Sequence, residues 1–313
     1  MLEIYNGMDF VKADLPIIPW LIHPIIPSTG IVLFHGSPGI GKSTIAWQLA
    51  NNVEQGSALL GMMSNKARVL LLSLDMPKYG LHARWKESKF EPLFDLVITE
   101  NFDPAGAAFQ HSKVFKEVRE WHDKNNYQLV IVDSLAHVVA FGKSVNADEA
   151  VGPTYDSFKQ WFPHTCIMFI HHDRKKKMKD DGTWPEPTDE DFIGSQQWKA
   201  QCTTQLHLSR ASNTLLRLDL AKTQVGPTWN EPMELYMNEQ GTALMEYNEH
   251  QQKEEANQYK EWVLKARVEN PEFDKMSKKK QMTIIASLSG KSIPTLYRMR
   301  RSVDIQSLSM LIS

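Results

Sequence analysis

The chain has 313 residues, which is longer than an average domain and long enough to bury a sizeable core. Its 35 Lys and Arg against 37 Asp and Glu give a formal charge of −2, which excludes a uniformly basic nucleic-acid-binding protein and requires local clusters instead. Two cysteines cannot build a disulfide framework, and there is neither a secretory leader nor an apolar run of about 20 residues, so we expect a cytoplasmic protein outside the membrane.

The first 30 residues are punctuated by Pro16, Pro19, Pro24 and Pro27, which predicts an irregular lead-in around the core rather than a helix. Buried-strand patterns then alternate with helical patterns, in the order 30–36, 43–55, 68–74, 79–90, 96–99, 109–125, 129–133 and 148–162. Further strands are expected, as antiparallel additions to the sheet, at 166–171, 203–209, 215–220 and 232–237. Continuous apolar runs at 69–72 and 129–132 fit strands covered on both faces, so we predict an α/β fold with a mostly parallel central sheet flanked by helices.

The part of the chain from residue 251 onward is basic, with twelve Lys and Arg against seven Asp and Glu. A charged helix over 251–268 is expected, followed by a small helical module. The predicted organisation is therefore a core with its lead-in at 1–245, a helical connector at 246–273 and a module at 274–313.

Residues 36–43 match the pattern G-x-x-x-x-G-K-[ST], directly after a hydrophobic strand and before a helix. Small residues let consecutive backbone N–H groups turn inward, and the following helix presents its positive end to phosphate. We expect Lys42 to reach the β- and γ-phosphates of ATP, and Ser43 to bind Mg²⁺. The predicted nucleotide-binding residues are Gly36, Ser37, Pro38, Gly39, Ile40, Gly41, Lys42, Ser43 and Thr44. A glycine-rich turn without a ligand is the alternative, and the flanking strand and helix argue against it.

Two carboxylates follow later strands. Asp133 ends the apolar run at 129–132 and is the candidate for holding Mg²⁺ together with Ser43; an aspartate at this place can also be a helix cap. Asp75 ends the strand that comes after the phosphate-binding loop (the P-loop, residues 36–43) and its helix. A carboxylate at this place can face the γ-phosphate and activate water.

Several stretches together resemble the RecA-like P-loop ATPases, in particular the RepA type of hexameric replicative helicase and its DnaB-like relatives. They are residues 20–43, the segment 73–77 followed by Arg84, and the pair His171-His172; the resemblance extends over about residues 15–240. It implies that Asp75 is the catalytic carboxylate, where the relatives usually carry glutamate, and that His172 is a sensor of the γ-phosphate. Core histidines or metal ligands are the other interpretations of the histidine pair, although neighbours on a strand point to opposite faces.

The segment 220–227 resembles the strand and turn from which DnaB-like proteins extend a lysine and an arginine into the nucleotide site of the neighbouring subunit. Lys222 matches the lysine, whereas Gln224 stands where the arginine would be. The resemblance therefore implies a homo-oligomer, expected to be a hexamer, with an incomplete pair of trans-acting cations.

Two regions are candidates for contact with DNA. The loops at 138–152 and 173–193 would line the channel of a RecA-like ring, and the second carries the candidates Arg174, Lys175, Lys176, Lys177 and Lys179 for single-stranded DNA; a solvated surface loop is the alternative. Helices at 276–289 and 293–303 around a Gly290-Lys291 turn resemble a helix-turn-helix, with Thr295, Arg298, Arg300 and Arg301 as candidates for duplex DNA. A helical cap that binds a partner protein or the core is the alternative.

The leading hypothesis is an ATPase that acts as a ring-forming helicase and moves on single-stranded DNA. The alternative is a DNA-binding loader, an origin-recognition factor or a recombination mediator whose ATP state switches assembly. A metabolic kinase would need an acceptor pocket and a catalytic lid, and the sequence suggests neither.

Overall fold

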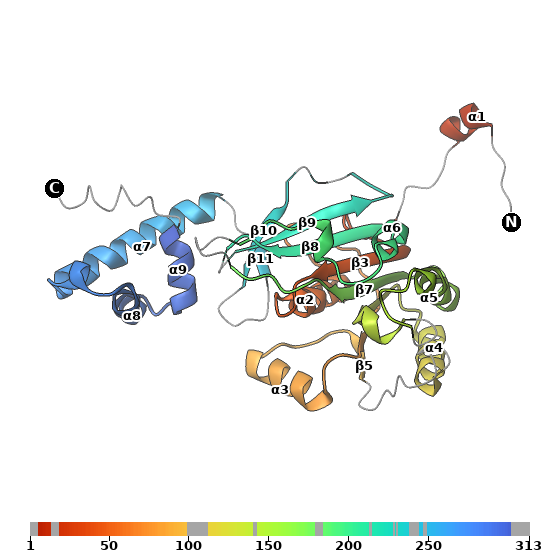
Figure 1. Ribbon diagram of the computed structural model, residues 1–313, viewed down its shortest axis with the longest axis horizontal. Coiled ribbons are helices and arrows are strands. Elements are labelled where there is room, and N and C mark those ends of the chain that lie inside the picture. The colour runs from red at the N-terminus through yellow and green to blue at the C-terminus, as the bar shows by residue number, and fades with distance from the viewer. Residues whose placement is uncertain are drawn as a thin grey trace.

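The computed structural model describes most of the chain, with gaps. The described residues are 6–13, 19–98, 112–139, 143–178, 184–212, 215–227, 229, 231–237, 244–246 and 249–301. Within these residues, nine strands form one sheet in the spatial order β11-β10-β9-β8-β3-β7-β6-β4-β5 (Figure 1). In chain order these are β3 (Gly30–Gly36), β4 (Val69–Ser73), β5 (Asp95–Ile98), β6 (Leu129–Asp133), β7 (Cys166–His172), β8 (Thr204–Arg210), β9 (Leu216–Thr223), β10 (Met233–Met237) and β11 (Leu244–Glu246).

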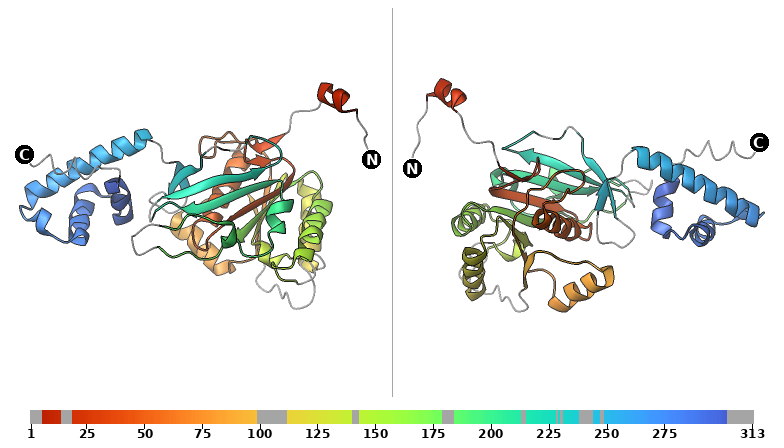
Figure 2. Two further views of the ribbon diagram at one scale, coloured as in Figure 1. Left: turned by 45° about the horizontal axis from the view of Figure 1, so that its top comes forward. Right: turned by 180° about the vertical axis from the view of Figure 1, so that it is seen from behind.

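Helices cover both faces of this sheet, because the fully apolar strands alternate their side chains between two hydrophobic clusters. On β3, Val32 and Phe34 pack with α2 (Lys42–Gln55), while Ile31 and Leu33 pack on the opposite face. That opposite face is covered by α4 (Lys113–Asn125), α5 (Asp148–Trp161) and the short α6 (Gln197–Gln201) (Figure 2). On the α2 side, α3 (Lys78–Ser88) adds Leu81 to the hydrophobic cluster. The predicted α/β class and mostly parallel sheet are confirmed.

One expectation about strand direction is wrong. Strands β7 and β8, expected as antiparallel additions, both run parallel to β3 and flank it on either side. Long connections allow this arrangement: α5 returns the chain before β7, and the segment with α6 returns it before β8. The described strands that join this sheet in antiparallel pairs are β9, β10 and β11.

The lead-in contains more regular structure than expected. A six-residue helix, α1 (Gly7–Lys12), begins after Asn6, whose side chain accepts a hydrogen bond from the N–H of Met8 at 3.0 Å. A hairpin of β1 (Trp20–Ile22) and β2 (Ile26–Pro27) follows. Its apolar side chains are buried in the core on the α2 side, so this part of the lead-in packs on the core as expected.

Three helices form a separate cluster near the C-terminal end, on the side of β10 and β11 (Figures 1 and 2). They are α7 (Glu249–Glu269), α8 (Lys278–Ser289) and α9 (Ile293–Arg301), and their shared apolar core is built from Ala256, Tyr259, Val263, Ala266, Phe273, Met282, Ile285, Leu296 and Met299. Gly290 ends α8 at φ +68°, a left-handed conformation that favours glycine. The helix α7, expected as a connector, therefore also packs against α8 and α9. The domain limits at 1–245, 246–273 and 274–313 stay a prediction.

Short 3₁₀ turns lie at Leu135–His137, Asp189–Asp191 and Phe273–Lys275. Among the helices that the structure describes, none is both long enough and apolar enough to cross a bilayer.

We predict that Trp198→Ala lowers the free energy of unfolding by about 3–5 kcal/mol, because it leaves a cavity in the hydrophobic cluster under α4, α5 and α6. The side chain is fully buried, packs edge-to-face on Tyr155 with ring centroids 5.2 Å apart, and donates from Nε1 to the carbonyl of Val145 at 2.8 Å. Urea unfolding measures the change. The matched control is Trp121→Ala on α4, where a 54% exposed tryptophan should change stability by less than about 0.5 kcal/mol; equal effects of the two substitutions would contradict the packing.

Candidate nucleotide-binding site

The loop between β3 and α2 is shaped by glycines. A Cβ atom at Gly36 would lie 2.3 Å from the carbonyl oxygen of Leu208 on β8, so only glycine allows the two strands to approach at this point. Gly41 precedes α2 at φ +111° and provides no side-chain cap for the helix. The first N–H groups of α2 are therefore available to an anion, as a phosphate site requires.

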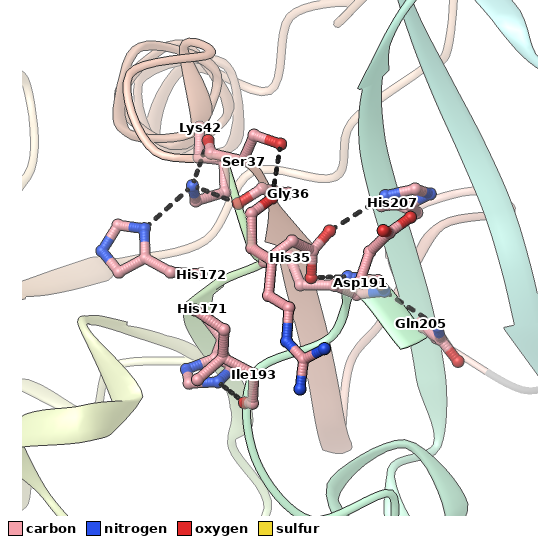
Figure 3. Close-up of polar contacts among 12 residues, drawn as sticks. His35, Gly36, Ser37, Lys42, His171, His172, Asp191, Ile193, Gln205 and His207 are labelled. Carbon is pink, nitrogen blue, oxygen red and sulfur yellow. Dashed lines mark hydrogen bonds and ion pairs between the residues drawn. The ribbon is translucent and has the colours of Figure 1, made fainter. Parts of the chain in front are cut away.

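Lys42 bends back over this loop. Its Nζ donates to the carbonyls of Gly36 at 2.7 Å and Ser37 at 2.9 Å, and lies 3.2 Å from Nδ1 of His172 (Figure 3). Burial lowers the pKa of Lys42 to about 8, although the carboxylates of Asp173, Asp133 and Asp75 oppose the shift. A bound phosphate would supply the close negative charge that this buried ammonium group lacks.

Ser43 and Asp133 lie together, as predicted for a magnesium site. The Ser43 hydroxyl donates to Oδ2 of Asp133 at 2.8 Å. Asp133 is buried, and burial raises its pKa while the Ser43 hydrogen bond opposes the shift. Two hard oxygen ligands beside the phosphate loop fit Mg²⁺, which is usually held by one or two protein oxygens, substrate phosphates and water. A cation here would offset the cost of burying the Asp133 charge.

His172 connects Lys42 with Asp75. Its Nδ1 faces the ammonium group of Lys42, so the proton of the neutral ring belongs on Nε2, which lies 3.6 Å from Oδ2 of Asp75. Burial, followed by the charge of Lys42, lowers the pKa of His172 and keeps the ring neutral. Asp75 is half exposed and also lies 3.9 Å from Nε2 of His137. The five predicted catalytic and metal-binding residues of the chain's own site, Lys42, Ser43, Asp75, Asp133 and His172, are thus neighbours.

The other histidine of the pair points elsewhere. The ring of His171 is buried, and its Nε2 donates to the carbonyl of Ile193 at 2.5 Å (Figure 3). Burial lowers its pKa to about 4. His171 therefore holds the end of the loop after β7, while His172 faces the P-loop.

The structure reveals a buried network that the sequence analysis missed. His35, in the strand before Gly36, donates from Nδ1 to Asp173 at 2.9 Å, and Nε2 of His207 on β8 donates to the second Asp173 oxygen at 3.1 Å. Gln205 Nε2 donates to Nε2 of His35 at 2.8 Å. The His35 ring therefore donates at Nδ1 and accepts at Nε2, as a neutral imidazole does. Burial opposes ionisation of Asp173, but the hydrogen bonds from His207 and His35 hold its pKa well below the usual range.

This network contains three groups that can bind metal, with ligand atoms within 4.8 Å of one another. The two imidazole rings are stacked, with centroids 4.5 Å apart and an angle of 16° between their planes. The nitrogen lone pairs of the two imidazoles lie in the ring planes, and in nearly parallel rings they do not point at one metal ion. The observed contacts instead fit a carboxylate of Asp173 that accepts one N–H at each oxygen. The network therefore acts as a structural clamp: Asp173 also donates its backbone N–H to the carbonyl of Gly36 at 3.0 Å.

Lys222 lies apart from the residues around Lys42. Its Nζ donates to three carbonyls around the end of α6, those of Lys199, Ala200 and Cys202, at 2.6–3.0 Å. Two strand pairings give its position on the sheet: Lys222 on β9 lies opposite Gln205 on β8, and Gln205 lies opposite Leu33 on β3. Lys222 is therefore level with a residue that precedes Gly36 in β3. A role of Lys222 in nucleotide chemistry thus requires a neighbouring subunit.

The predicted DNA-binding residues of the loop after β7 differ in their surroundings. The side chains of Arg174, Lys175 and Lys177 are exposed, whereas Lys176 forms an ion pair with Asp191 at 2.5 Å. Lys179 lies outside the described residues.

In the C-terminal module, the backbone N–H of Thr295 donates to the Ser292 hydroxyl at 3.4 Å. Arg300 is half-buried near Tyr259. Burial raises the pKa of the Tyr259 phenol, and the positive charge of Arg300 opposes this rise. The side chains of Arg298 and Arg301 lie outside the described residues.

We predict that His171 makes folding pH-dependent. Its pKa is about 4 in the folded protein against 6.5 for an unperturbed histidine, so the unfolded chain binds an extra proton between these values, and the free energy of unfolding falls as the pH decreases through this window. His171→Gln should remove roughly 1 kcal/mol per pH unit from the slope between pH 6.5 and 4, measured by urea unfolding. The control is the exposed His82→Gln, and an unchanged slope in His171→Gln would contradict the assignment.

A family match and one solved structure agree with this architecture. Residues 6–178 match a family model described as "AAA domain". No curated protein matches the sequence. Among solved structures, one described as an ATPase domain is similar at 14% identity and a TM-score of 0.54, over 77% of this chain and 95% of that one. The flagellar accessory protein FlaH from Methanocaldococcus jannaschii gives 12% identity and a TM-score of 0.46, over 70% and 89%. The family match spans more than half of the residues, and the chain therefore belongs to this AAA-domain family, as a P-loop ATPase with the expected RecA-like fold.

Proposed function

We propose that the protein is an ATP-driven motor that hydrolyses MgATP between the subunits of a ring and moves on single-stranded DNA, as a replicative helicase does. The observation that carries the proposal is the convergence of Lys42, Ser43, Asp133, Asp75 and His172 at the carboxyl ends of β3, β4, β6 and β7. These are the residue types that phosphoryl transfer needs for a phosphate, a metal ion, an attacking water and a sensor.

The proposed roles follow from the contacts. Lys42 exchanges its bonds to the Gly36 and Ser37 carbonyls for oxygens of the β- and γ-phosphates. Ser43 and Asp133 hold Mg²⁺, which neutralises charge on the phosphates when bound. Asp75 orients the attacking water and accepts its proton, since its carboxylate is solvent-accessible and not held by a strong ion pair among the described residues. His172, neutral and beside both Lys42 and Asp75, senses the γ-phosphate.

Assembly is supported by Lys222, whose position beyond the chain's own site suits a contact in trans. Its three carbonyl partners must be released before the ammonium group can reach a neighbour's nucleotide. Gln224 carries no charge at the place of the second cation, so the transition state would lack one strong stabiliser and turnover would be slow. The solved ATPase domain of similar fold supports the ATPase part of the proposal, while movement on DNA rests on the residues of this chain.

DNA contact is proposed through the exposed cations of the loop after β7 for a single strand, and through α9 for a duplex. The predicted set keeps Arg174, Lys175 and Lys177 as phosphate partners, because Lys176 is occupied by Asp191. In the C-terminal module, a glycine turn between α8 and α9 supports a helix-turn-helix arrangement.

A second candidate function is a DNA-binding loader or recombination mediator that uses ATP to switch assembly. It is favoured by the aspartate at position 75, which is one methylene shorter than glutamate, and by the uncharged Gln224. Both features reduce hydrolysis without weakening nucleotide binding.

We predict that Lys42→Ala weakens MgATP binding by about 10–100-fold and abolishes hydrolysis, because each hydrogen bond to a charged group contributes about 1.5–3 kcal/mol. Titration calorimetry and phosphate release measure the two effects. Lys113→Ala on α4, where the side chain is 91% exposed, is the control and should bind ATP like the unmodified protein. Normal ATP binding by Lys42→Ala would disprove the site.

The proposed function is tested by ATP turnover with and without single-stranded DNA, combined with solution mass and unwinding of a forked duplex. A hexamer with DNA-stimulated hydrolysis and unwinding is the expected result. A monomer that binds ATP without unwinding would reject the motor and favour the switch.

A further inference from the structure

A small pocket lies beside the P-loop, on the side of β8. Its volume is about 200 Å³, and its walls include Ser37 and Pro38 of the P-loop, Trp184, and Arg210 at the end of β8. Typical small-molecule pockets measure roughly 300–1,000 Å³, so this one is large enough for a single planar group rather than for a whole nucleotide.

Arg210 is the most informative residue of the pocket. Its guanidinium lies over the ring of Trp184, 5.3 Å from the centroid, and its side chain is half-buried. Among the described residues no carboxylate lies within ion-pair distance of Arg210, whereas Arg217 on the next strand lies near both Glu186 and Glu234. A partly desolvated cation without a counter-ion favours an anionic ligand.

The charges around the pocket agree with this. Lys175 is exposed and lines the pocket, and it too has no carboxylate partner among the described residues. Among the described residues of the lining, both acidic side chains are already engaged: Asp191 pairs with Lys176, and Asp173 accepts from His35 and His207. The free charge that these described residues offer is therefore positive.

We propose that this pocket binds one unstacked base of a single-stranded nucleic acid against the Trp184–Arg210 pair, with the adjoining phosphate on Arg210 and Lys175. The inference rests on the proposed function and names where the strand is held. Aromatic rings and arginine planes both stack with bases, and a base in this pocket leaves its phosphate at the mouth, where the two cations lie.

The location gives the pocket a connection to ATP. Ser37 forms part of its wall and donates from Oγ to the carbonyl of Arg174 at 3.4 Å, and the next residue, Pro38, also lines it. The neighbouring Asp173 N–H donates to Gly36, whose carbonyl also accepts from Lys42. A bound base thus contacts the outer side of the same loop that holds the phosphates on its inner side.

The test measures binding of fluorescently labelled oligo(dT) to the full chain by anisotropy, with a second oligonucleotide of equal length in which abasic sites replace the bases. The variants are Trp184→Ala and Arg210→Gln. The matched control is Trp121→Ala, an exposed tryptophan on α4. Thermal unfolding of each variant reports whether it folds, and the abasic probe tests stacking on the unmodified protein.

Trp184→Ala should weaken oligo(dT) binding by about tenfold, in the range measured for base–aromatic stacking, while Trp121→Ala has no effect. The unmodified protein should prefer oligo(dT) to the abasic probe, and Trp184→Ala should lose that preference. Arg210→Gln should weaken both probes, because it removes a phosphate contact.

Equal binding of the two probes, or oligo(dT) binding by both variants that matches the control, would overturn the pocket assignment while leaving the proposed function intact. Displacement of oligo(dT) by polyglutamate at the same charge concentration would instead assign the pocket to an acidic protein partner. No binding of oligo(dT) by the unmodified protein would reject the proposed function together with the pocket.

Discussion

The carbonyl of Gly36 is the point on which the rest of the site depends. It accepts hydrogen bonds from the Nζ of Lys42 and from the backbone N–H of Asp173, so it links the P-loop lysine with the strand that carries His172. On the other side of β3, β8 approaches so closely that a Cβ at residue 36 would clash with the carbonyl of Leu208. Because residue 36 is glycine and has no Cβ, β8 can pair closely with β3 beside the nucleotide site.

Buried charges of both signs surround this point, and ligands of opposite charge would relieve them. Burial lowers the pKa of Lys42 to about 8 and raises that of Asp133. Phosphate would favour the charged form of Lys42, and Mg²⁺ that of Asp133, so MgATP should stabilise an arrangement that is electrostatically costly without it. Asp173 is different, because two histidine N–H groups already satisfy its charge inside the protein. Asp173 therefore has a structural role, whereas Asp133 keeps the role proposed for it in Mg²⁺ binding.

The P-loop has two sides, and different residues use each. Lys42 and His172 lie on the inner side, whereas Ser37 and Pro38 form a wall of the pocket that contains Trp184 and Arg210. The clamp made by Asp173 stands between them, since its backbone N–H holds Gly36 and its side chain is held by His207 on β8. Only a few direct contacts, made by Asp173, separate the two sides of the P-loop.

Local patterns in the sequence determined much of this protein. The apolar runs located β3, β4, β6 and β7 within one residue, whereas β9 extends three residues past its predicted end and β1, β2 and β11 were not expected. The motif at 36–43 placed Lys42 and Ser43 at the start of α2. Strand periodicity and phosphate-loop chemistry both depend on neighbours in the chain, which is why the sequence could supply them. The sequence could not establish that β7 and β8 run parallel to β3, since direction depends on how long connections cross the sheet. It also missed His35, Asp173 and His207, although a histidine inside a buried apolar strand, as at His35, was a usable signal. Those three, like Trp184 and Arg210, are distant in the chain and meet only when the sheet has formed, so the tertiary structure alone decided which polar groups share a site.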